Sequence, residues 1–402
     1  MEPTVICTVC NSQNLKTVLD FGKQPPANRF LSDSNALQET FSLALGYCAD
    51  CGMIQLTQRI PFDAIRPRFD WLLYNEPEGH LDDVALELKK LPGITDASRI
   101  LGITYKDQST LNRLLKLGMN HGQCIDEINF DIPEIFFGLE TIQQVLRNSK
   151  TVTQLKNQYG AADVLIMRHV IEHSDNAKEL MLSLKELIAD NGYVVIELPD
   201  SSKIFSSCNH AFVWEEHISY FTEETLKLLA EEVGAEIAWF KRYSYPYEDS
   251  LLAAFRFNAL PKKNNQSEAD ISETENTLLK FRTSFDDFKI QWRKTLEKYI
   301  HQGEKVAVFG AGHLSGKFIN FFELHDLIDC VIDDHPKKSG MNMPGSLLPI
   351  RPSSALSQYN IKVCISTLSP ESELKVRNKM TSYFDQGGSF VSAFAGKQNF
   401  YG

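Results

Sequence analysis

Little in this chain of 402 residues directs it to a membrane or to nucleic acid. No apolar run reaches the roughly 20 residues that a helix needs to cross a bilayer, and the start, Met-Glu-Pro-Thr-Val, lacks the charges and apolar stretch of a signal peptide. Basic tracts are absent and the net charge is -11, which argues against nucleic acid and mildly against other anionic polymers. We therefore expect a soluble globular protein with no membrane and no nucleic-acid partner.

Cysteine is scarce, and four of the eight cysteines stand in two short pairs, Cys7-Thr-Val-Cys10 and Cys48-Ala-Asp-Cys51. A disulfide within such a pair is disfavoured because the loop is too tight for a relaxed bridge, and the other four cysteines show no pairing pattern. Two CxxC turns have the ligand spacing of a tetrahedral four-thiolate zinc site. We predict a closed, structural zinc site at Cys7, Cys10, Cys48 and Cys51. Thiolate ligands need a reducing compartment, which favours the cytoplasm.

The length of the chain predicts two or three domains. Residues 1–75 are expected to form the small zinc-binding module of short strands and turns. Residues 76–260 alternate strands and helices, and residues 261–402 combine a polar linker over 261–272, a long amphipathic helix over 273–302 and a second α/β unit. The sequence leaves a monomer and a homodimer both open, although the long helix could support self-association.

The middle segment predicts strands over 99–103, 123–126, 163–167 and 193–199, with helices over 109–118 and 175–190. Nearly continuous apolar strands that alternate with helices are typical of a mostly parallel, doubly wound α/β sheet. Ligands of such sheets bind beyond the carboxyl ends of the strands. The second unit repeats the pattern with strands over 305–309 and 330–333. Between them, Gly310-Ala311-Gly312 resembles a nucleotide-binding turn that lacks a third glycine, so a purely structural role stays open.

Several short stretches occur together in one order. They are Pro26-Ala27-Asn28-Arg29-Phe30, Arg168-His169-Val170-Ile171-Glu172-His173, Ile196-Glu197-Leu198-Pro199-Asp200, Glu216-His217-Ile218-Ser219-Tyr220-Phe221, Phe309-Gly310-Ala311-Gly312 and Asp333-Asp334-His335-Pro336-Lys337-Lys338-Ser339-Gly340. With the paired cysteines, this order resembles the class I S-adenosylmethionine (SAM) dependent sugar C-methyltransferases over nearly the whole chain. The resemblance implies a four-cysteine zinc module, a class I methyltransferase-like domain and a C-terminal Rossmann-like domain.

The resemblance also implies catalytic residues. Methylation of a carbon next to a ketone needs a base for the α-proton and polar groups that hold the enolate oxygen. The family's proposed base is a histidine in a Tyr-x-Glu-His motif, which is His217 here, and histidine suits the task because its pKa lies near operating pH. Glu216 would orient this base or bind substrate, and His173 and Tyr74 would steady the enolate oxygen or the sugar. Trp214 replaces the motif's tyrosine, so any help from that tyrosine is missing or moved. Each histidine could instead be an ordinary structural residue.

Substrate contacts are expected from two further regions. In the family, a tyrosine-rich stretch joins the zinc module to the next domain and reaches the substrate. Here Glu76 and His80 could contact a sugar from this stretch, unless it is a solvated connector. The C-terminal domain of the family helps to bind the substrate's nucleotide or sugar, which makes Gly310, Gly312 and Lys317 candidates for substrate binding. Lys317, Lys337 and Lys338 could meet a diphosphate. Trp214 is a further candidate for substrate binding.

The cofactor loop departs from the family pattern, which has an acid and two glycines, as in Glu-x-Gly-x-x-Asp-Gly. Gly102 stands where the acid belongs, Thr104 and Gln108 replace the glycines, and Lys106 adds a charge that is unfavourable near a sulfonium. The residues expected to bind SAM are Gly102, Thr104, Asp107, Asp126 and Arg168. A second departure is the segment 247–250, Tyr-Glu-Asp-Ser, where relatives have His-Gly-Gly-Ser.

Three functions therefore remain open from the sequence. The leading hypothesis is methyl transfer from SAM to a keto-sugar nucleotide or a related small molecule, with structural zinc. A second is a SAM-independent isomerase or lyase that uses the same histidines and carboxylates for proton transfer. A third is a binding protein with an inactive methyltransferase domain.

Overall fold

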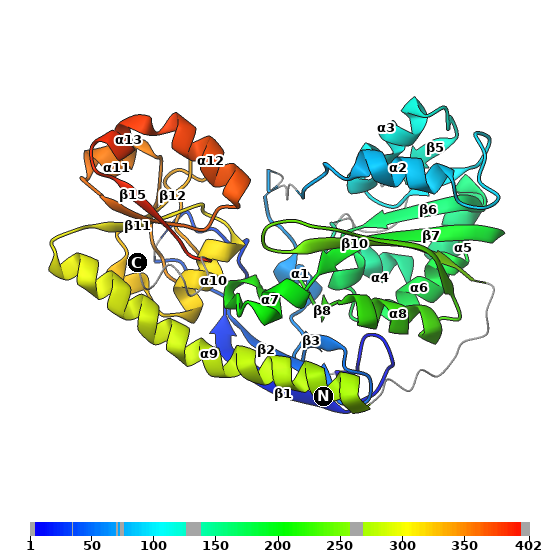
Figure 1. Ribbon diagram of the computed structural model, residues 1–402, viewed down its shortest axis with the longest axis horizontal. Helices are drawn as coiled ribbons and strands as arrows, with labels where there is room; N and C mark the ends of the chain where they lie inside the picture. Colours follow the sequence, from blue (N-terminus) through cyan, green and yellow to red (C-terminus); the bar gives the residue numbers. More distant parts are fainter. Residues whose placement is uncertain are drawn as a thin grey trace.

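The computed structural model describes residues 5–33, 35–69, 71–72, 76–125, 138–257 and 268–394, which form a mixed α/β structure with three sheets (Figure 1). The long helix α9, Glu268–His301, runs along the four-stranded sheet and reaches the C-terminal sheet. Among the described residues no helix has the length and apolar character to cross a membrane. The domain boundaries given above stay predictions.

The first sheet is antiparallel, with the strand order β1-β2-β3-β8. Its strands are β1 Leu15–Gln24, β2 Phe41–Cys48, β3 Ile54–Leu56 and β8 Ser219–Tyr220, and helix α1, Phe62–Ile65, follows it. The last strand comes from far along the chain, because Ile54 pairs with Tyr220. The N-terminal sheet is thus joined by hydrogen bonds to the segment that carries His217.

The four paired cysteines lie together beside this sheet. Their ligand atoms lie within 4.8 Å of one another, with Sγ–Sγ distances of 3.5 Å for Cys7–Cys51 and 3.6 Å for Cys10–Cys48. A residue with positive φ follows each pair, Asn11 with a φ of 60° and Gly52 with a φ of 73°. Asn11 donates its N–H to the carbonyl of Cys7, and Gly52 donates to that of Cys48. These turns direct both thiols of a pair to one point, so the four residues fit a tetrahedral zinc ion.

The second sheet has the order β5-β4-β6-β7-β10-β9, with β5, β4, β6 and β7 parallel and the last two strands antiparallel. Its strands are β4 Ile100–Gly102, β5 Gly122–Cys124, β6 Ala162–Arg168, β7 Ile188–Asp200, β9 Glu236–Tyr243 and β10 Asp249–Arg256. Its helices are α2 Leu81–Lys89, α3 Gln108–Lys116, α4 Ile142–Leu146, α5 Ser149–Tyr159, α6 Ala177–Lys185, α7 Ser202–Ser206 and α8 Glu223–Glu232. The sheet is mostly parallel and doubly wound, as predicted.

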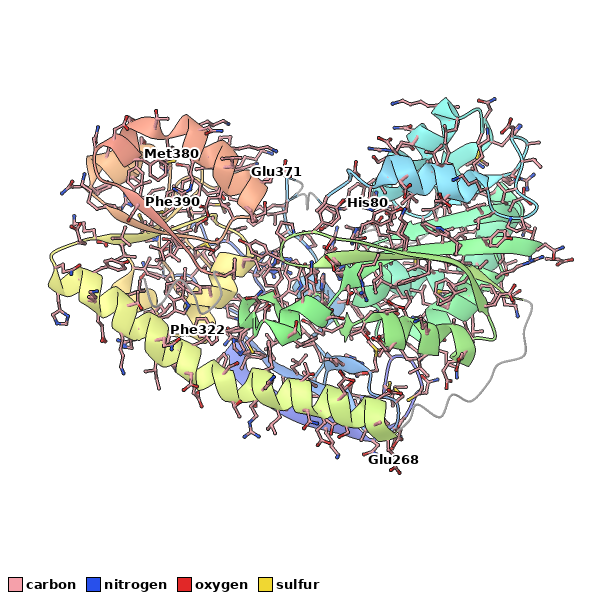
Figure 2. All side chains as sticks on the ribbon, viewed as in Figure 1. His80, Glu268, Phe322, Glu371, Met380 and Phe390 are labelled. Atoms are coloured by element: carbon pink, nitrogen blue, oxygen red, sulfur yellow. The ribbon has the colours of Figure 1, made fainter. Side chains whose placement is uncertain are left out.

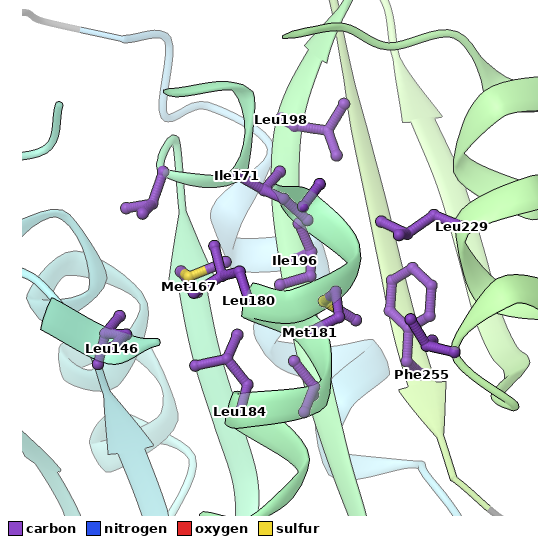
Figure 3. Close-up of a cluster of buried hydrophobic side chains, with 14 of the residues drawn as sticks. Leu146, Met167, Ile171, Leu180, Met181, Leu184, Ile196, Leu198, Leu229 and Phe255 are labelled. Atoms are coloured by element: carbon purple, nitrogen blue, oxygen red, sulfur yellow. The ribbon is translucent and has the colours of Figure 1, made fainter. Parts of the chain in front are cut away.

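Each face of this sheet is covered by its own apolar core. Leu81, Val84 and Leu111 from α2 and α3 pack on one face. On the other face, α6 and α8 pack their leucines against Ile196 and Phe255 (Figure 3). The helix predicted over 175–190 ends at Lys185, because Ile188 pairs with Ala162 and starts the 13-residue strand β7. Strand pairing here overrides a helical sequence pattern.

The third sheet is parallel, with the order β13-β12-β11-β14-β15, as in a Rossmann-like domain. Its strands are β11 Val306–Phe309, β12 Cys330–Ile332, β13 Ile350–Arg351, β14 Val363–Ser366 and β15 Ser389–Ser392. Its helices are α10 His313–Phe321, α11 Ser354–Gln358, α12 Pro370–Lys379 and α13 Thr381–Asp385. Ligands of such a sheet bind beyond the ends of β11 and β12.

Helix α9 connects the first and third sheets. It begins at Glu268, so residues 268–272 are helical and do not belong to a linker as we predicted (Figure 2). Acidic residues in its first turn favour the helix because they face the positive end of the helix dipole. Phe281 and Trp292 are buried in one core that holds residues of β1, β2, α10 and β11.

Zinc removal should destabilise the first sheet, which is too small to bury a core of its own. We expect Cys48→Ser to reduce bound zinc from about one ion per chain to near zero and to lower the melting temperature. Elemental analysis and thermal unfolding measure both quantities. Cys208→Ser, outside the cluster, is the control. Full zinc retention in Cys48→Ser would contradict the assignment.

The long helix should contribute strongly to stability through Trp292, which is 1% exposed. We expect Trp292→Ala to reduce the free energy of unfolding by about 3–5 kcal/mol because it leaves a large cavity. Ile290→Ala, at a position that is 51% exposed on the same helix, should cost about 0.5 kcal/mol or less. Urea unfolding compares the two, and equal losses would show that α9 is not anchored through its buried face.

Candidate active site

A cavity of about 410 Å³ lies where the three sheets meet. The first sheet and its loops contribute Asn28 and Phe30, the second contributes its strand ends, and the third contributes Gly312 and neighbouring residues. The polar side chains in the wall are Asn28, Glu76, His169, Glu172, His173, Glu216, His217, Glu248, His313, Lys338 and Ser369. Carboxyl groups and imidazoles therefore dominate a space large enough for a small-molecule substrate.

His173 and His217 face each other in this wall. His173 ends a 3₁₀ turn, Ile171–His173, that follows β6, and its ring meets the His217 ring edge-on at 5.0 Å between centroids. Its Nδ1–H donates to the carbonyl oxygen of Glu216 at 2.7 Å. The carboxylate of Glu216 accepts a hydrogen bond from Nδ2 of Asn28 at 2.8 Å. Glu216 thus positions His173 through its backbone and is itself held by the N-terminal segment.

His217 lies against aromatic rings. Its centroid is 4.7 Å from that of Trp214, which in turn stacks on His313 at 3.5 Å. Burial, together with the neighbouring imidazoles of His173, His313 and His169, holds the pKa of His217 well below its usual value. The ring is therefore neutral near pH 7 and can accept a proton. Trp214 and His217 both line the cavity, and the roles predicted for them, substrate binding for Trp214 and catalysis for His217, stay predictions.

A second group of polar and charged side chains surrounds the carboxylate of Glu197 of β7. Its carboxylate accepts hydrogen bonds from Nε2 of His80 at 2.9 Å, from Oγ of Ser250 at 2.9 Å and from Nε of Arg168. Burial alone would raise the pKa of Glu197, but hydrogen bonds from His169 and His80 and the charge of Arg168 hold it well below its usual value. His80 was expected to contact a sugar, but both of its ring nitrogens form hydrogen bonds inside the protein, Nε2 with Glu197 and Nδ1 with the hydroxyl of Tyr245.

Arg168 connects this layer to the loop after β4. Its Nη1 donates to the carbonyl of Lys106 at 2.6 Å and lies 3.3 Å from Glu78 Oε1. The carboxylate of Asp107 accepts from the backbone amides of Arg168, Thr104 and Ile103 at 2.8–3.0 Å. Burial raises the pKa of Asp107 to about 7 despite these donors. Asp107 therefore fixes the loop against β6.

The same loop allows a test of whether SAM fits. Gly102 provides no open space, because a Cβ there would lie 2.8 Å from Asp107 Cβ and 2.9 Å from Cys124 Sγ. Thr104 and Lys106 are buried within the loop. Nη2 of Arg168, however, is buried and has no hydrogen-bond partner among the described residues, which suits the carboxylate of the cofactor's amino-acid end. The fit thus depends on Arg168 and not on a glycine-rich turn.

Two predicted residues, Tyr74 and Asp126, lie outside the described residues. Glu76 lines the cavity, and its carboxylate lies 3.9 Å from Nζ of Lys106. That contact directs the Lys106 charge toward a carboxylate, although burial lowers the pKa of Lys106.

The C-terminal turn reaches the cavity at Gly312. A Cβ at Gly312 would meet nothing within 4 Å, so the wall is open there. Gly310 has a φ of +100° and packs on Leu368, so it serves the turn itself. Lys317 is 1% exposed and pairs with Glu215 at 2.6 Å, which corrects our expectation that its charge meets a diphosphate. Lys338, which the sequence also offered for a diphosphate, lines the cavity, and its Nζ pairs with Asp333 at 2.9 Å.

The sequence reasoning missed three residues in the wall. Glu172 stands inside the motif that we quoted, but its carboxylate was given no role. Glu248 replaces a glycine of the family pattern, and burial together with the nearby Glu76 and Glu172 raises its pKa well above the usual value. His313, directly after the glycine turn, stacks on Trp214, and burial lowers its pKa to about 3. The departure at residues 247–250 was the only signal for Glu248.

Comparisons with known families agree with this architecture. Residues 7–65 match a zinc binding domain, residues 108–238 a methyltransferase domain, and residues 259–394 a C-methyltransferase C-terminal domain. The methyltransferase match begins at Gln108, the last of the altered residues of the cofactor loop. The chain is 21% identical over 363 residues to the C-methyltransferase NovU of Streptomyces niveus, with 87% of this chain and 86% of that protein covered.

Solved structures with similar segments include two methyltransferases. The CcbJ methyltransferase from Streptomyces caelestis is 11% identical, with a TM-score of 0.30, over 47% of this chain and 94% of that chain. The 1,6-didemethyltoxoflavin-N1-methyltransferase of Burkholderia thailandensis is 12% identical, with a TM-score of 0.29, over 44% and 77%. A zinc binding domain, a methyltransferase domain and a C-methyltransferase C-terminal domain are thus matched in this order along the chain, and together with the similarity to a C-methyltransferase these matches support a SAM-dependent methyltransferase.

Proposed function

We propose that this enzyme methylates a carbon next to the carbonyl group of a nucleotide-linked sugar, with His217 as the base. The observation that carries the proposal is the position of His217 in the wall of a cavity that residues of all three sheets line, with a pKa held well below the usual histidine value. A base for a weakly acidic C–H must be unprotonated before it reacts, and the lowered pKa supports that state near pH 7.

The residues of the wall can divide the chemistry as follows. His217 takes the α-proton, the C–H electron pair forms the enolate double bond, and negative charge develops on the carbonyl oxygen. Burial and the nearby Glu76 and Glu172 raise the pKa of Glu248 well above its usual value, and in its protonated form Glu248 can donate a hydrogen bond to that oxygen. His173, with Nδ1–H engaged by Glu216, has Nε2 available on the cavity side. SAM, when bound, supplies the electrophilic methyl group, and Arg168 would hold its carboxylate.

The part of the cavity wall that comes from the third sheet supports a sugar nucleotide as the substrate. Gly312 leaves room for a ligand to approach the backbone, and Nζ of Lys338, which donates to the carbonyl of Ala311 at 2.6 Å, lies at the end of the same turn. A cation beside an open glycine turn suits a diphosphate. The thiolate ligands favour a cytoplasmic location for this metabolism.

His217→Gln should remove the base and leave the fold unchanged. With a keto-deoxysugar nucleotide in D₂O and no SAM, we expect exchange of the α-hydrogen to fall by about 10²–10⁴-fold, and methyl transfer to fall alike. Mass spectrometry of the sugar measures both reactions. His325→Gln, an exposed histidine of the C-terminal unit, is the control. Full activity of His217→Gln would reject His217 as the base.

Arg168→Met should weaken the cofactor site. A charge-assisted hydrogen bond contributes about 1.5–3 kcal/mol, so the dissociation constant of S-adenosylhomocysteine should rise by about 10–100-fold. Calorimetric titration of zinc-loaded protein measures this change, with thermal unfolding as a check on the fold. Arg147→Met, which breaks an ion pair with Asp175 elsewhere on the same domain, is the matched control. Equal affinities would place the carboxylate of the cofactor elsewhere.

A further inference from the structure

The cavity contains a second group of residues with the character of a metal site. One ligand atom each from Glu172, His173 and His217 lies within 4.8 Å of the others. Two imidazoles and one carboxylate form a donor set that divalent transition metals such as Zn²⁺, Co²⁺ and Fe²⁺ accept readily. This group is separate from the four cysteines and differs from them in its nitrogen and oxygen donors.

Glu172 provides an independent indication of a ligand. It is 1% exposed, its side chain lines the cavity, and its Oε2 has no hydrogen-bond partner among the described residues. An unpaired buried carboxylate oxygen is costly because it has lost its water and gained nothing in return. A cation between Glu172 and the two histidines would compensate this loss.

Neighbouring residues orient these side chains by hydrogen bonds and close polar contacts, as residues around a metal site usually orient its ligands. His173 donates its Nδ1–H to the Glu216 carbonyl, so Nε2 is the nitrogen left for a metal, the arrangement that metal-binding histidines usually show. Nδ1 of His169 lies 3.5 Å from the other oxygen of Glu172. His169 also has a φ of +54°, a conformation that is strained for a residue with a side chain and is common at functional sites.

We propose that Glu172, His173 and His217 bind one divalent transition metal ion in the cavity, in addition to the structural zinc. This site goes beyond the proposed function and opposes it, because the metal engages the imidazole that the base needs. A chain with this site filled would therefore be inhibited in proton abstraction. The binding itself can be measured without any substrate, so it stands or falls separately from the proposed reaction.

The test uses full-length protein that carries zinc at its four cysteines. Co²⁺ is added, bound metal is counted by equilibrium dialysis with elemental analysis, and the visible absorption of cobalt is recorded. We expect one further metal ion per chain with a dissociation constant in the micromolar range. The strong near-ultraviolet absorption of thiolate-bound cobalt should stay absent, which shows that the cysteines keep their zinc.

Two variants locate the ion. Glu172→Gln should weaken cobalt binding by at least about tenfold, because an amide oxygen is a poorer ligand than a carboxylate. Glu76→Gln removes the same charge from the same wall but no ligand, and should bind cobalt as the parent chain does. No metal beyond the structural zinc, or equal cobalt binding by Glu172→Gln and the parent chain, would overturn the proposal.

The inhibitory consequence has its own readout. Added Zn²⁺ should suppress α-hydrogen exchange over the concentration range in which it fills the second site, and brief chelation that spares the structural zinc should restore exchange. Stimulation by the metal would overturn the inhibitory role. If no sugar nucleotide is turned over at all, the proposed reaction fails. The number of cobalt ions bound per chain still tests the second metal site in that case.

Discussion

The four thiolates beside the N-terminal sheet are the constraint on which the rest of the structure depends. This sheet is too small to bury a core of its own, so its stability depends on a bound metal and on packing against neighbouring elements. Cys7, Val9 and Cys48 belong to the apolar core on one face of the second sheet. Leu19 and Leu43 belong instead to the core that contains residues of α9 and of the third sheet. The zinc-binding sheet is therefore the piece that fixes the two larger sheets relative to each other.

The active cavity is a consequence of this arrangement. Its wall needs Asn28 from the first sheet to hold Glu216, a strand end of the second sheet to present His173, and the Gly312 turn of the third. Strand β8 pairs with β3 only two residues after His217, so the base candidate is fixed by the zinc-binding sheet. Loss of zinc would thus disturb the chemistry without any contact between the ion and the substrate.

Charge at the strand ends is balanced by partners inside the protein. Glu197 is compensated by Arg168, His80 and His169, and Lys317 by Glu215. Glu172 and Arg168 each also keep one buried polar atom, Oε2 and Nη2, that has no hydrogen-bond partner among the described residues. These two atoms are therefore candidates for ligand contacts.

The sequence by itself determined the elements that depend on local pattern. The CxxC spacing specified the zinc ligands, apolar periodicity specified the doubly wound sheet, and short motifs specified the family. Only the tertiary structure decided which polar groups are available, because availability depends on partners far apart in the sequence. Lys317 and His80 looked accessible in the sequence but are engaged by Glu215 and Glu197, whereas Glu172 and Glu248 became candidates only when three sheets enclosed them.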